Sequence, residues 1–368
     1  MLSSSAMLRF IVRSIATTVV CSLFYTLGVP SAQAEQKQET WVDEKTEQLR
    51  QADQYANELL RKEKQMAKKP RRDKAFQWRV FGKFGYEYDD NVALASNWKT
   101  FRSSAEDIDA GRYSVGTGIS ADYRLGERDK VGVTFYRRQS FHDDGLDEYN
   151  FQDYLTRLRY QHMGSLADRL LSTQFSYNFD HGLLDRHSYA SGHEWRMDNT
   201  WEWSERQLWS FYQALEAKNF RNKGYDKSVS SRDGFYEQTG LMYTFLFDQR
   251  RRSVSLAYEF SLAETEGNNY DAVYNGLRAM LRTPVIEKIR FETYFLFQDA
   301  YYRHFVTSPK RQDFRYQYEF RLSRPLGAHW SVGTFYRRTD VNNPNDGVLG
   351  QFNYDRNIGG VDLTFSYG

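Results

Sequence analysis

Cysteine, proline and long apolar runs are scarce in this 368-residue chain. The single cysteine, Cys21, lies inside the one apolar run of any length, near the N-terminus. A helical membrane bundle needs repeated apolar runs of about 20 residues. One such run and a mean hydropathy of −0.75 therefore exclude that class. Because no cysteine follows Cys21, the rest of the chain has no disulfide, thiolate nucleophile or cysteine metal site.

Aromatic residues are abundant by contrast. The chain has 27 Tyr, 26 Phe and 8 Trp, and 27% of its residues are charged. So many aromatic residues exclude a disordered chain, because such chains bury little surface. A chain that is polar on average yet rich in aromatics is typical of an outer-membrane β-barrel. In such a barrel alternate residues face lipid and a wet lumen, and aromatic residues ring both interfaces.

Residues 1–34 have the three parts of a secretory signal peptide. Arg9 and Arg13 form the positive region, residues 15–29 are apolar, and residues 32–34 read Ala-Gln-Ala, a small-x-small cleavage site. Cleavage there removes two of the 50 basic residues and none of the 48 acidic ones, which leaves 48 of each. This neutral balance gives no reason to expect a nucleic-acid partner.

Residues 35–74 are predicted to form a short periplasmic helix with a basic end. Residues 36–69 contain no Gly or Pro, and Pro70 follows them. Val42, Leu49 and Ala56 recur every seven residues, so the helix is either one strand of a coiled coil or a lone solvated helix. A coiled coil would bind a periplasmic protein or a second copy. The basic end either meets anionic lipid or is a solvated linker; it comprises Arg61, Lys62, Lys64, Lys68, Lys69, Arg71, Arg72 and Lys74.

In residues 75–368 apolar and polar residues alternate with a period of two, as in strands that have two different faces. In one such stretch Val254, Leu256 and Tyr258 share one face, and Ser253 and Ser255 the other. We therefore predict an all-β fold, a transmembrane antiparallel up-and-down barrel of about 14 strands. The predicted strands are 75–89, 110–125, 130–142, 150–162, 169–181, 190–203, 207–220, 234–247, 252–264, 271–283, 288–302, 312–323, 329–340 and 352–367.

The connections between these strands differ in length on the two rims. After odd-numbered strands most are long, as at 90–109, 182–189 and 221–233, whereas those after even-numbered strands are short, as at 204–206 and 248–251. Short turns are periplasmic in outer-membrane barrels. Both termini are therefore expected in the periplasm, and the protein in the outer membrane of a Gram-negative bacterium.

All six prolines are predicted to lie outside the strands, because proline cannot donate a hydrogen bond to a closed ladder. Pro284 and Pro325 are expected in short turns. At the C-terminus, Gly360, Leu363, Phe365 and Tyr367 resemble the last-strand signal that the barrel-assembly machinery recognises. The Gly359-Gly360 pair predicts a β-bulge, since the outward parity changes around it.

Residues 86–92 open the first strand with Tyr-Glu-Tyr-Asp-Asp-Asn-Val. This opening resembles the Y-x-Y-D-x-N-V pattern of a broad group of Gram-negative outer-membrane barrels. The group includes porins of exopolysaccharide systems and the barrel domain of Slam-type surface lipoprotein assembly modifiers. The resemblance implies an outer-membrane barrel in contact with lipid and lipopolysaccharide. Slam proteins carry a tetratricopeptide domain before the barrel, and this chain has no 34-residue repeat there.

Two histidine–aspartate groupings invite comparison with omptin-type barrel proteases. They are His142-Asp143-Asp144 and Asp180-His181, both expected near outer strand ends. General acid–base catalysis would suit such pairs. Omptins have fewer strands, however, and Asp and His are ordinary in outer loops, so we predict no enzymatic activity. No cofactor is predicted, and the remaining histidines show no metal-ligand spacing.

The inward face of the predicted barrel is rich in charge of both signs. Two interpretations stay open: a polar lining that passes hydrophilic solutes and a salt-bridged filling that braces the wall. The residues predicted to line a pore are Arg79, Arg138, Arg157, Arg159, Glu259, Arg290, Glu292, Arg315, Glu319 and Arg321.

Three functions are compatible with this sequence. The leading hypothesis is a channel for polar solutes or an exported polymer. The second is a secretion or assembly component whose helical segment binds a partner or plugs the pore. The third is a structural or adhesive surface protein that acts through its long loops.

Overall fold

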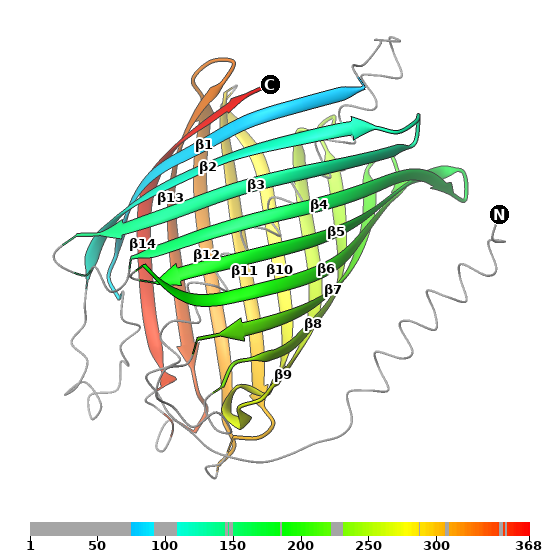
Figure 1. The fold of residues 1–368 in the computed structure, drawn as a ribbon. Helices are drawn as coiled ribbons and strands as arrows, with labels where there is room; N and C mark the ends of the chain where they lie inside the picture. Colours follow the sequence, from blue (N-terminus) through cyan, green and yellow to red (C-terminus); the bar gives the residue numbers. More distant parts are fainter. Residues whose placement is uncertain are drawn as a thin grey trace.

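The computed structural model describes residues 75–91, 109–143, 146, 150–184, 186–221, 231–286, 288–305, 309–345, 349 and 352–368. Within them fourteen antiparallel strands close into one barrel, in which β1 pairs with both β2 and β14 (Figure 1). The predicted 14-stranded barrel is confirmed. The strands are β1 (Phe76–Asp89), β2 (Ala110–Arg124), β3 (Asp129–His142), β4 (Phe151–Leu166), β5 (Arg169–Leu184), β6 (His187–Ser204), β7 (Gln207–Phe220), β8 (Gly234–Phe247), β9 (Arg252–Thr265), β10 (Ala272–Ile286), β11 (Ile289–Tyr302), β12 (Gln312–Pro325), β13 (Trp330–Asn342) and β14 (Tyr354–Tyr367).

The predicted signal peptide, residues 1–34, and helical segment, residues 35–74, lie outside the described residues and stay predictions. Among the residues that the structure describes, no helix is long and apolar enough to cross a membrane.

Each strand pairs with its neighbours in the chain, so the barrel is up-and-down. Tight turns join most even strands to the following odd ones. Ala167 and Asp168, between β4 and β5, have φ angles of 51° and 59°. Two successive positive φ angles are the type I′ geometry, whose twist matches that of the flanking strands.

The connection between β5 and β6 differs from the prediction. A long loop was expected at 182–189, but β5 extends to Leu184 and β6 begins at His187. Leu184 pairs with His187, and the register shifts between Gly182 and Leu183. The residues on both sides of the turn continue the ladder. The prediction missed these pairs because the alternation of apolar and polar residues ends before them.

The positions of two prolines also differ from the prediction. Pro284 lies inside β10, opposite Arg290, and Pro325 is the last residue of β12, opposite Ser331. Both are at the rim of short turns, and the register shifts directly after Pro284. A missing amide donor costs little there, because ladder pairing is ending.

The predicted bulge at Gly359-Gly360 is wrong. Both glycines pair without a register shift, with Tyr88 and Glu87 of β1 on one side and with β13 on the other. Tyr354 and Ile358 face the interior instead and are buried there, 7% and 2% exposed. Apolar residues that face inward near the long-loop end made the alternation look interrupted.

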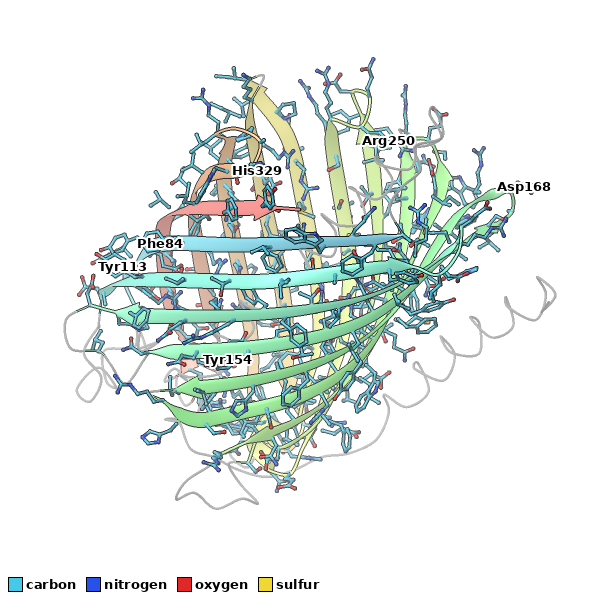
Figure 2. All side chains as sticks on the ribbon, turned by 45° about the horizontal axis from the view of Figure 1, so that its top comes forward. Phe84, Tyr113, Tyr154, Asp168, Arg250 and His329 are labelled. Atoms are coloured by element: carbon cyan, nitrogen blue, oxygen red, sulfur yellow. The ribbon has the colours of Figure 1, made fainter. Side chains whose placement is uncertain are left out.

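The outer surface of the barrel is apolar and aromatic. Phe84, Tyr113 and Tyr154 project from it, as Figure 2 shows. Near the short turns, aromatic side chains of neighbouring strands touch, as in the pairs Trp78–Tyr367 and Trp330–Phe365, whose ring centroids are 5.9 and 4.8 Å apart. Such a ring of aromatics is the interfacial girdle of a membrane barrel. The short-turn rim itself is polar, with Asp168, Arg250 and His329 labelled in Figure 2.

Candidate functional site

The interior wall is the candidate site, because the register places polar and charged residues there. On β12, Tyr318 and Phe320 are exposed on the outside, so Arg315, Glu319 and Arg321 face the lumen. The same parity, carried across each ladder, places all ten predicted lining residues inward. Their orientation therefore agrees with the prediction; whether they line a conducting path stays a prediction.

Five of these ten residues form ion pairs with side chains of other strands: Arg159, Glu259, Glu292, Glu319 and Arg321. Arg337 Nη2 lies 2.9 Å from Glu319 Oε2. Arg282 Nε lies 2.7 Å from Glu292 Oε1. Arg278 pairs with Glu259. Opposite charges thus neutralise each other across the ladder, as buried charges require.

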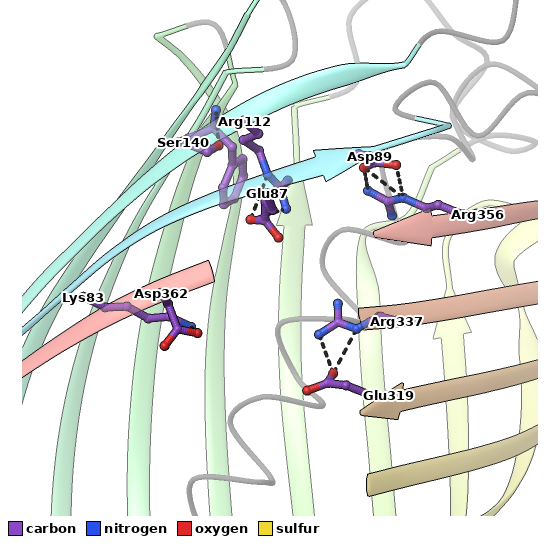
Figure 3. Close-up of polar contacts among 10 residues, drawn as sticks. Lys83, Glu87, Asp89, Arg112, Ser140, Glu319, Arg337, Arg356 and Asp362 are labelled. Atoms are coloured by element: carbon purple, nitrogen blue, oxygen red, sulfur yellow. Dashed lines mark hydrogen bonds and ion pairs between the residues drawn. The ribbon is translucent and has the colours of Figure 1, made fainter. Parts of the chain in front are cut away.

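Asp362 of β14 joins two cations of different strands. It pairs with Arg321 of β12, and Lys83 Nζ of β1 lies 3.6 Å away. Figure 3 shows Lys83 beside Asp362, and it also shows the Glu319–Arg337 pair. The predicted lining did not include Asp362, although the outward Phe365 and Tyr367 of the same strand place it on the inward face.

Two arginines of β4 take part in polar networks. Arg159 pairs with Asp122 of β2, which also receives Lys130 of β3 at 2.9 Å. Arg157 Nε donates to Asn178 Oδ1 at 2.7 Å, and Asn178 Nδ2 donates to Glu194 Oε1 at 2.6 Å.

The remaining predicted residues lie in three settings. Arg315 is buried and donates to Gln317 Oε1 at 3.1 Å. Arg138 lies opposite Asp153 across the β3–β4 ladder. Arg79 and Arg290 are exposed near the short-turn rim, and the Arg79 guanidinium lies 5.3 Å from the ring centre of Phe81.

Inward glycines provide space for the large side chains of neighbouring strands. A methyl group at Gly116 would collide with the Tyr136 ring, one at Gly118 with Phe81, and one at Gly240 with Tyr212. Phe81 and Tyr136 stack with centroids 5.9 Å apart and ring planes 15° apart. These rings therefore lie along the wall and do not point across the lumen.

The same arrangement holds for charged side chains. A methyl group at Gly132 would meet Arg159, and one at Gly333 would approach Arg321 at 3.1 Å. The Arg159 side chain is 13% exposed and that of Arg321 is 12% exposed. Both guanidiniums therefore lie against the wall beside their carboxylates.

Loop residues cover part of the long-loop mouth, next to β10–β14. The Arg311 guanidinium lies 4.2 Å from the ring centre of Tyr302 and 3.8 Å from that of Phe352, and it pairs with Asp313. Burial lowers the pKa of Arg311, and Asp313 acts in the opposite direction. A small apolar core surrounds this pair, made of Ala272, Ala300, Tyr302, Phe305, Leu349 and Phe352. Alternation in the sequence does not predict this core, although the aromatic residues inside the loops, Phe305 and Phe352, are a signal for it.

The resemblance motif occupies the seam where the barrel closes. Asp89 of β1 accepts from Arg356 Nε of β14 at 3.0 Å, and both side chains are buried (Figure 3). Asp90 accepts from the backbone N and the Nδ2 of Asn357 at 2.6 and 2.7 Å. Asn91 Nδ2 donates to the carbonyl of Asp355 at 2.9 Å. The motif thus ties the first strand to the last.

The C-terminal residues occupy both faces of β14. Leu363, Phe365 and Tyr367 face outward, whereas Gly360 faces inward. A methyl group at Gly360 would meet Glu87 Cβ at 2.9 Å and the Tyr86 carbonyl oxygen at 2.8 Å. This glycine therefore permits close approach of β1 at the seam.

The two histidine–aspartate groupings lie on different strands, at the end of β3 and in β5. Asp180 faces the lumen, whereas His181, the next residue of β5, faces outward. His142 ends β3, where its backbone N donates to Asn150 Oδ1 at 2.7 Å. Asp144 lies outside the described residues.

No protein-family model matches this chain, and no curated protein matches it. Several solved structures are similar in architecture. OmpT of Vibrio cholerae, in its in-vitro folded trimer form, has a TM-score of 0.45 and 7% identity over 80% of this chain and 100% of that one. An anion-selective porin from Comamonas acidovorans gives 0.46 and 8% over 79% and 99%. The outer membrane channel DcaP of Acinetobacter baumannii gives 0.47 and 9% over 79% and 97%.

At these identities and TM-scores, the similarities carry over no substrate or selectivity. The structure itself defines the class. A closed antiparallel barrel with short turns on one rim, an aromatic, apolar exterior and a charged interior is a β-barrel protein of the outer membrane.

Proposed function

We propose that this protein is a channel of the Gram-negative outer membrane that passes polar solutes or an exported polymer. The proposal rests on the orientation of the inward side chains, which lie along the barrel wall. Tyr136, Phe81 and Tyr212 lie over glycines of neighbouring strands. A wall that only needed filling would direct such bulky side chains toward the axis, as small barrels do.

The charges of the wall support the same proposal. Pairs such as Arg337–Glu319 and Arg159–Asp122 hold their charges beside the wall and satisfy them there. A lining of paired charges is strongly hydrated and carries no large excess of one sign. It therefore favours the passage of polar solutes over apolar ones.

Solute flux into liposomes tests this function. The purified mature protein is reconstituted, and swelling is followed in neutral polyols of increasing size. A channel predicts rapid swelling in small polyols and a size above which swelling stops. Protein-free liposomes and liposomes with heat-denatured protein are the controls. Absence of swelling with folded, heat-modifiable protein would overturn the proposal.

A further inference from the structure

A buried arginine lies near the long-loop end of the barrel, apart from the predicted pore-lining residues. Arg232 lies two residues before β8, and it is 2% exposed. Its guanidinium lies 4.6 Å from the ring centre of Tyr270, in the 3₁₀ helix η3 (Asn268–Tyr270). Among the residues that the structure describes, none forms an ion pair with Arg232. A buried guanidinium without a carboxylate partner is costly.

The acidic side chains of the same two connections bind other groups. Asp233 Oδ1 accepts from a backbone N at the end of β7 at 2.6 Å. Glu266 Oε2 accepts from Ser231 Oγ at 3.4 Å. Asp271 pairs with Arg303. These carboxylates are therefore engaged elsewhere and do not neutralise the buried guanidinium.

Two tyrosine hydroxyls are the acceptors that the structure gives this arginine. Arg232 Nη1 donates to Tyr189 Oη at 3.3 Å, and Nη2 donates to Tyr270 Oη at 3.5 Å. Both distances are at the long end of hydrogen bonding, so these contacts are weaker than a bidentate pair with a carboxylate. In the described part of the chain, Arg232 Nε has no hydrogen-bond partner.

A β-bulge turns Tyr189 toward this arginine. The register shift between β5 and β6 leaves Tyr189 without a partner on β5. Its ring meets the buried ring of Phe220 edge-on, with the centroids 5.7 Å apart. Bulges often re-aim a side chain next to a functional site. Because a hydroxyl both accepts and donates, Tyr189 Oη can also donate to a ligand that Arg232 binds.

A buried acceptor lies next to the stacked tyrosine in η3. Asn269 precedes Tyr270 and is 3% exposed, and within the described residues its Oδ1 accepts no hydrogen bond. Unpaired buried donors and acceptors each cost free energy. A ligand that offers an oxyanion to Arg232 Nε and a donor to Asn269 Oδ1 would satisfy both groups. A carboxylate is such an oxyanion, and a hydroxyl on the next carbon is such a donor.

We propose that Arg232, Tyr189 and Asn269 bind a small 2-hydroxy acid at the long-loop end of the barrel. The carboxylate oxygens accept from Arg232 Nε and one Nη, the side-on bidentate pairing that suits a guanidinium. The hydroxyl donates to Asn269 Oδ1. Because the guanidinium is buried, a ligand enters only with local movement of these side chains. The proposal does not depend on the channel function.

Isothermal titration calorimetry of the folded mature protein in detergent tests this site. The probes are lactate and propionate, which differ only in the hydroxyl group, and injections are spaced widely because movement before binding slows association. Lactate should bind about fivefold more tightly than propionate. R232Q should weaken the binding of both acids by about tenfold or more, because both lose the charge-assisted pair.

The matched control is R221Q, which removes an exposed arginine directly after β7 and should leave both affinities unchanged. N269L should lower the affinity for lactate to that for propionate and leave propionate binding as it is. A purely structural role of Asn269 would not produce this split. Heat-modifiability on gels reports folding. If R232Q fails to fold, R232K takes its place and must also weaken both acids, because lysine has no bidentate edge.

Equal lactate affinities of the wild type and R232Q, or no binding of either acid to the wild type, would overturn the site. Equal losses in R221Q and R232Q would overturn it as well, because they would report only the charge of the mouth. Inorganic phosphate is the competitor. Phosphate that binds more tightly than lactate and displaces it would overturn the assignment of an organic acid.

Discussion

Arg356 and Asp89 form the most buried ion pair among those at the closing seam, with side chains 3% and 1% exposed. Such a pair has been removed from water at considerable cost, and its two hydrogen-bonded partners satisfy each other. Removing one partner leaves an uncompensated charge. The pair therefore contributes more to the closure of this barrel than an exposed pair such as Arg251–Asp248.

Asp89→Leu should accordingly destabilise the barrel by about 3–5 kcal/mol, because Arg356 stays buried without its carboxylate. The double variant Asp89→Leu, Arg356→Met should recover most of that loss. The measurement is the urea concentration at which heat-modifiable protein is lost. Equal midpoints for the wild type and Asp89→Leu would show that the seam does not depend on this pair.

The inward glycines make a second prediction at this scale. Gly116→Val and Gly240→Val should displace Tyr136 and Tyr212 from the wall toward the axis. The overpacking costs about 1–3 kcal/mol, which a folded barrel tolerates, and channel conductance should fall because the displaced rings narrow the lumen. Gly359→Val is the matched control, because Gly359 faces outward with no atom within 4 Å of an added methyl group. An unchanged conductance in both inward variants would contradict the proposed orientation of the Tyr136 and Tyr212 rings along the wall.

At the scale of the strand, period-two alternation was sufficient to locate all fourteen strands, since every strand has two different environments. Lumen orientation followed as well, as for Arg157 and Arg321, because parity fixes which face a side chain occupies. The ion-pair partners could not be derived in this way. Asp362 joins Arg321 from 41 residues away, a contact that depends on registers between strands that no single strand encodes.

The alternation of apolar and polar residues failed to predict which way side chains face where the two faces of a strand no longer differ in polarity. Near the long-loop mouth, Tyr354 and Ile358 face inward and are buried, and Tyr354 packs against Val341 of β13. Loops in the same region also pack inward. Their sequences have no period-two alternation from which this packing could be predicted. At β5–β6, turn residues that resemble a loop continue the ladder to Leu184 and His187.

The rims of the barrel lead to a topology prediction. Epitope tags inserted in 90–109 or 221–233 should be accessible to antibody on intact cells, since the long-loop rim faces outward in such barrels. Tags in 248–251, between β8 and β9, should become accessible only after the outer membrane is permeabilised. The opposite pattern of labelling would mean that the barrel is inserted the other way round.

The closing strand provides another prediction. Phe365 packs against Trp330, and Tyr367 lies 5.9 Å from Trp78, centroid to centroid. Replacing Phe365 and Tyr367 with Asp places two charges on the lipid face and removes the outward aromatic side chains of the closing strand from the interfacial girdle. The variant should be degraded before assembly, so that no heat-modifiable band appears in outer-membrane fractions. A normal band would contradict the role of these residues in closing and assembling the barrel.

For the molecule as a whole, the exterior and the interior differ in polarity because they face different solvents. Exposed apolar side chains such as Phe84 and Leu256 suit lipid, and the paired charges inside suit water. For the helical segment predicted at 36–69, the two hypotheses of a plug and of a partner-binding helix lead to different expectations. A plug would make the full-length channel quieter than a variant that lacks this segment, whereas a partner-binding helix would leave conductance unaltered.

Single-channel recording of the refolded mature protein in planar bilayers tests the central claim most directly. If the inward side chains lie along the wall and leave the lumen open, the protein should insert with stable conductance steps of uniform size. The step size should scale with bulk salt conductivity. Folded, heat-modifiable protein that shows no steps, with or without residues 36–69, would contradict the channel and favour a braced, closed barrel.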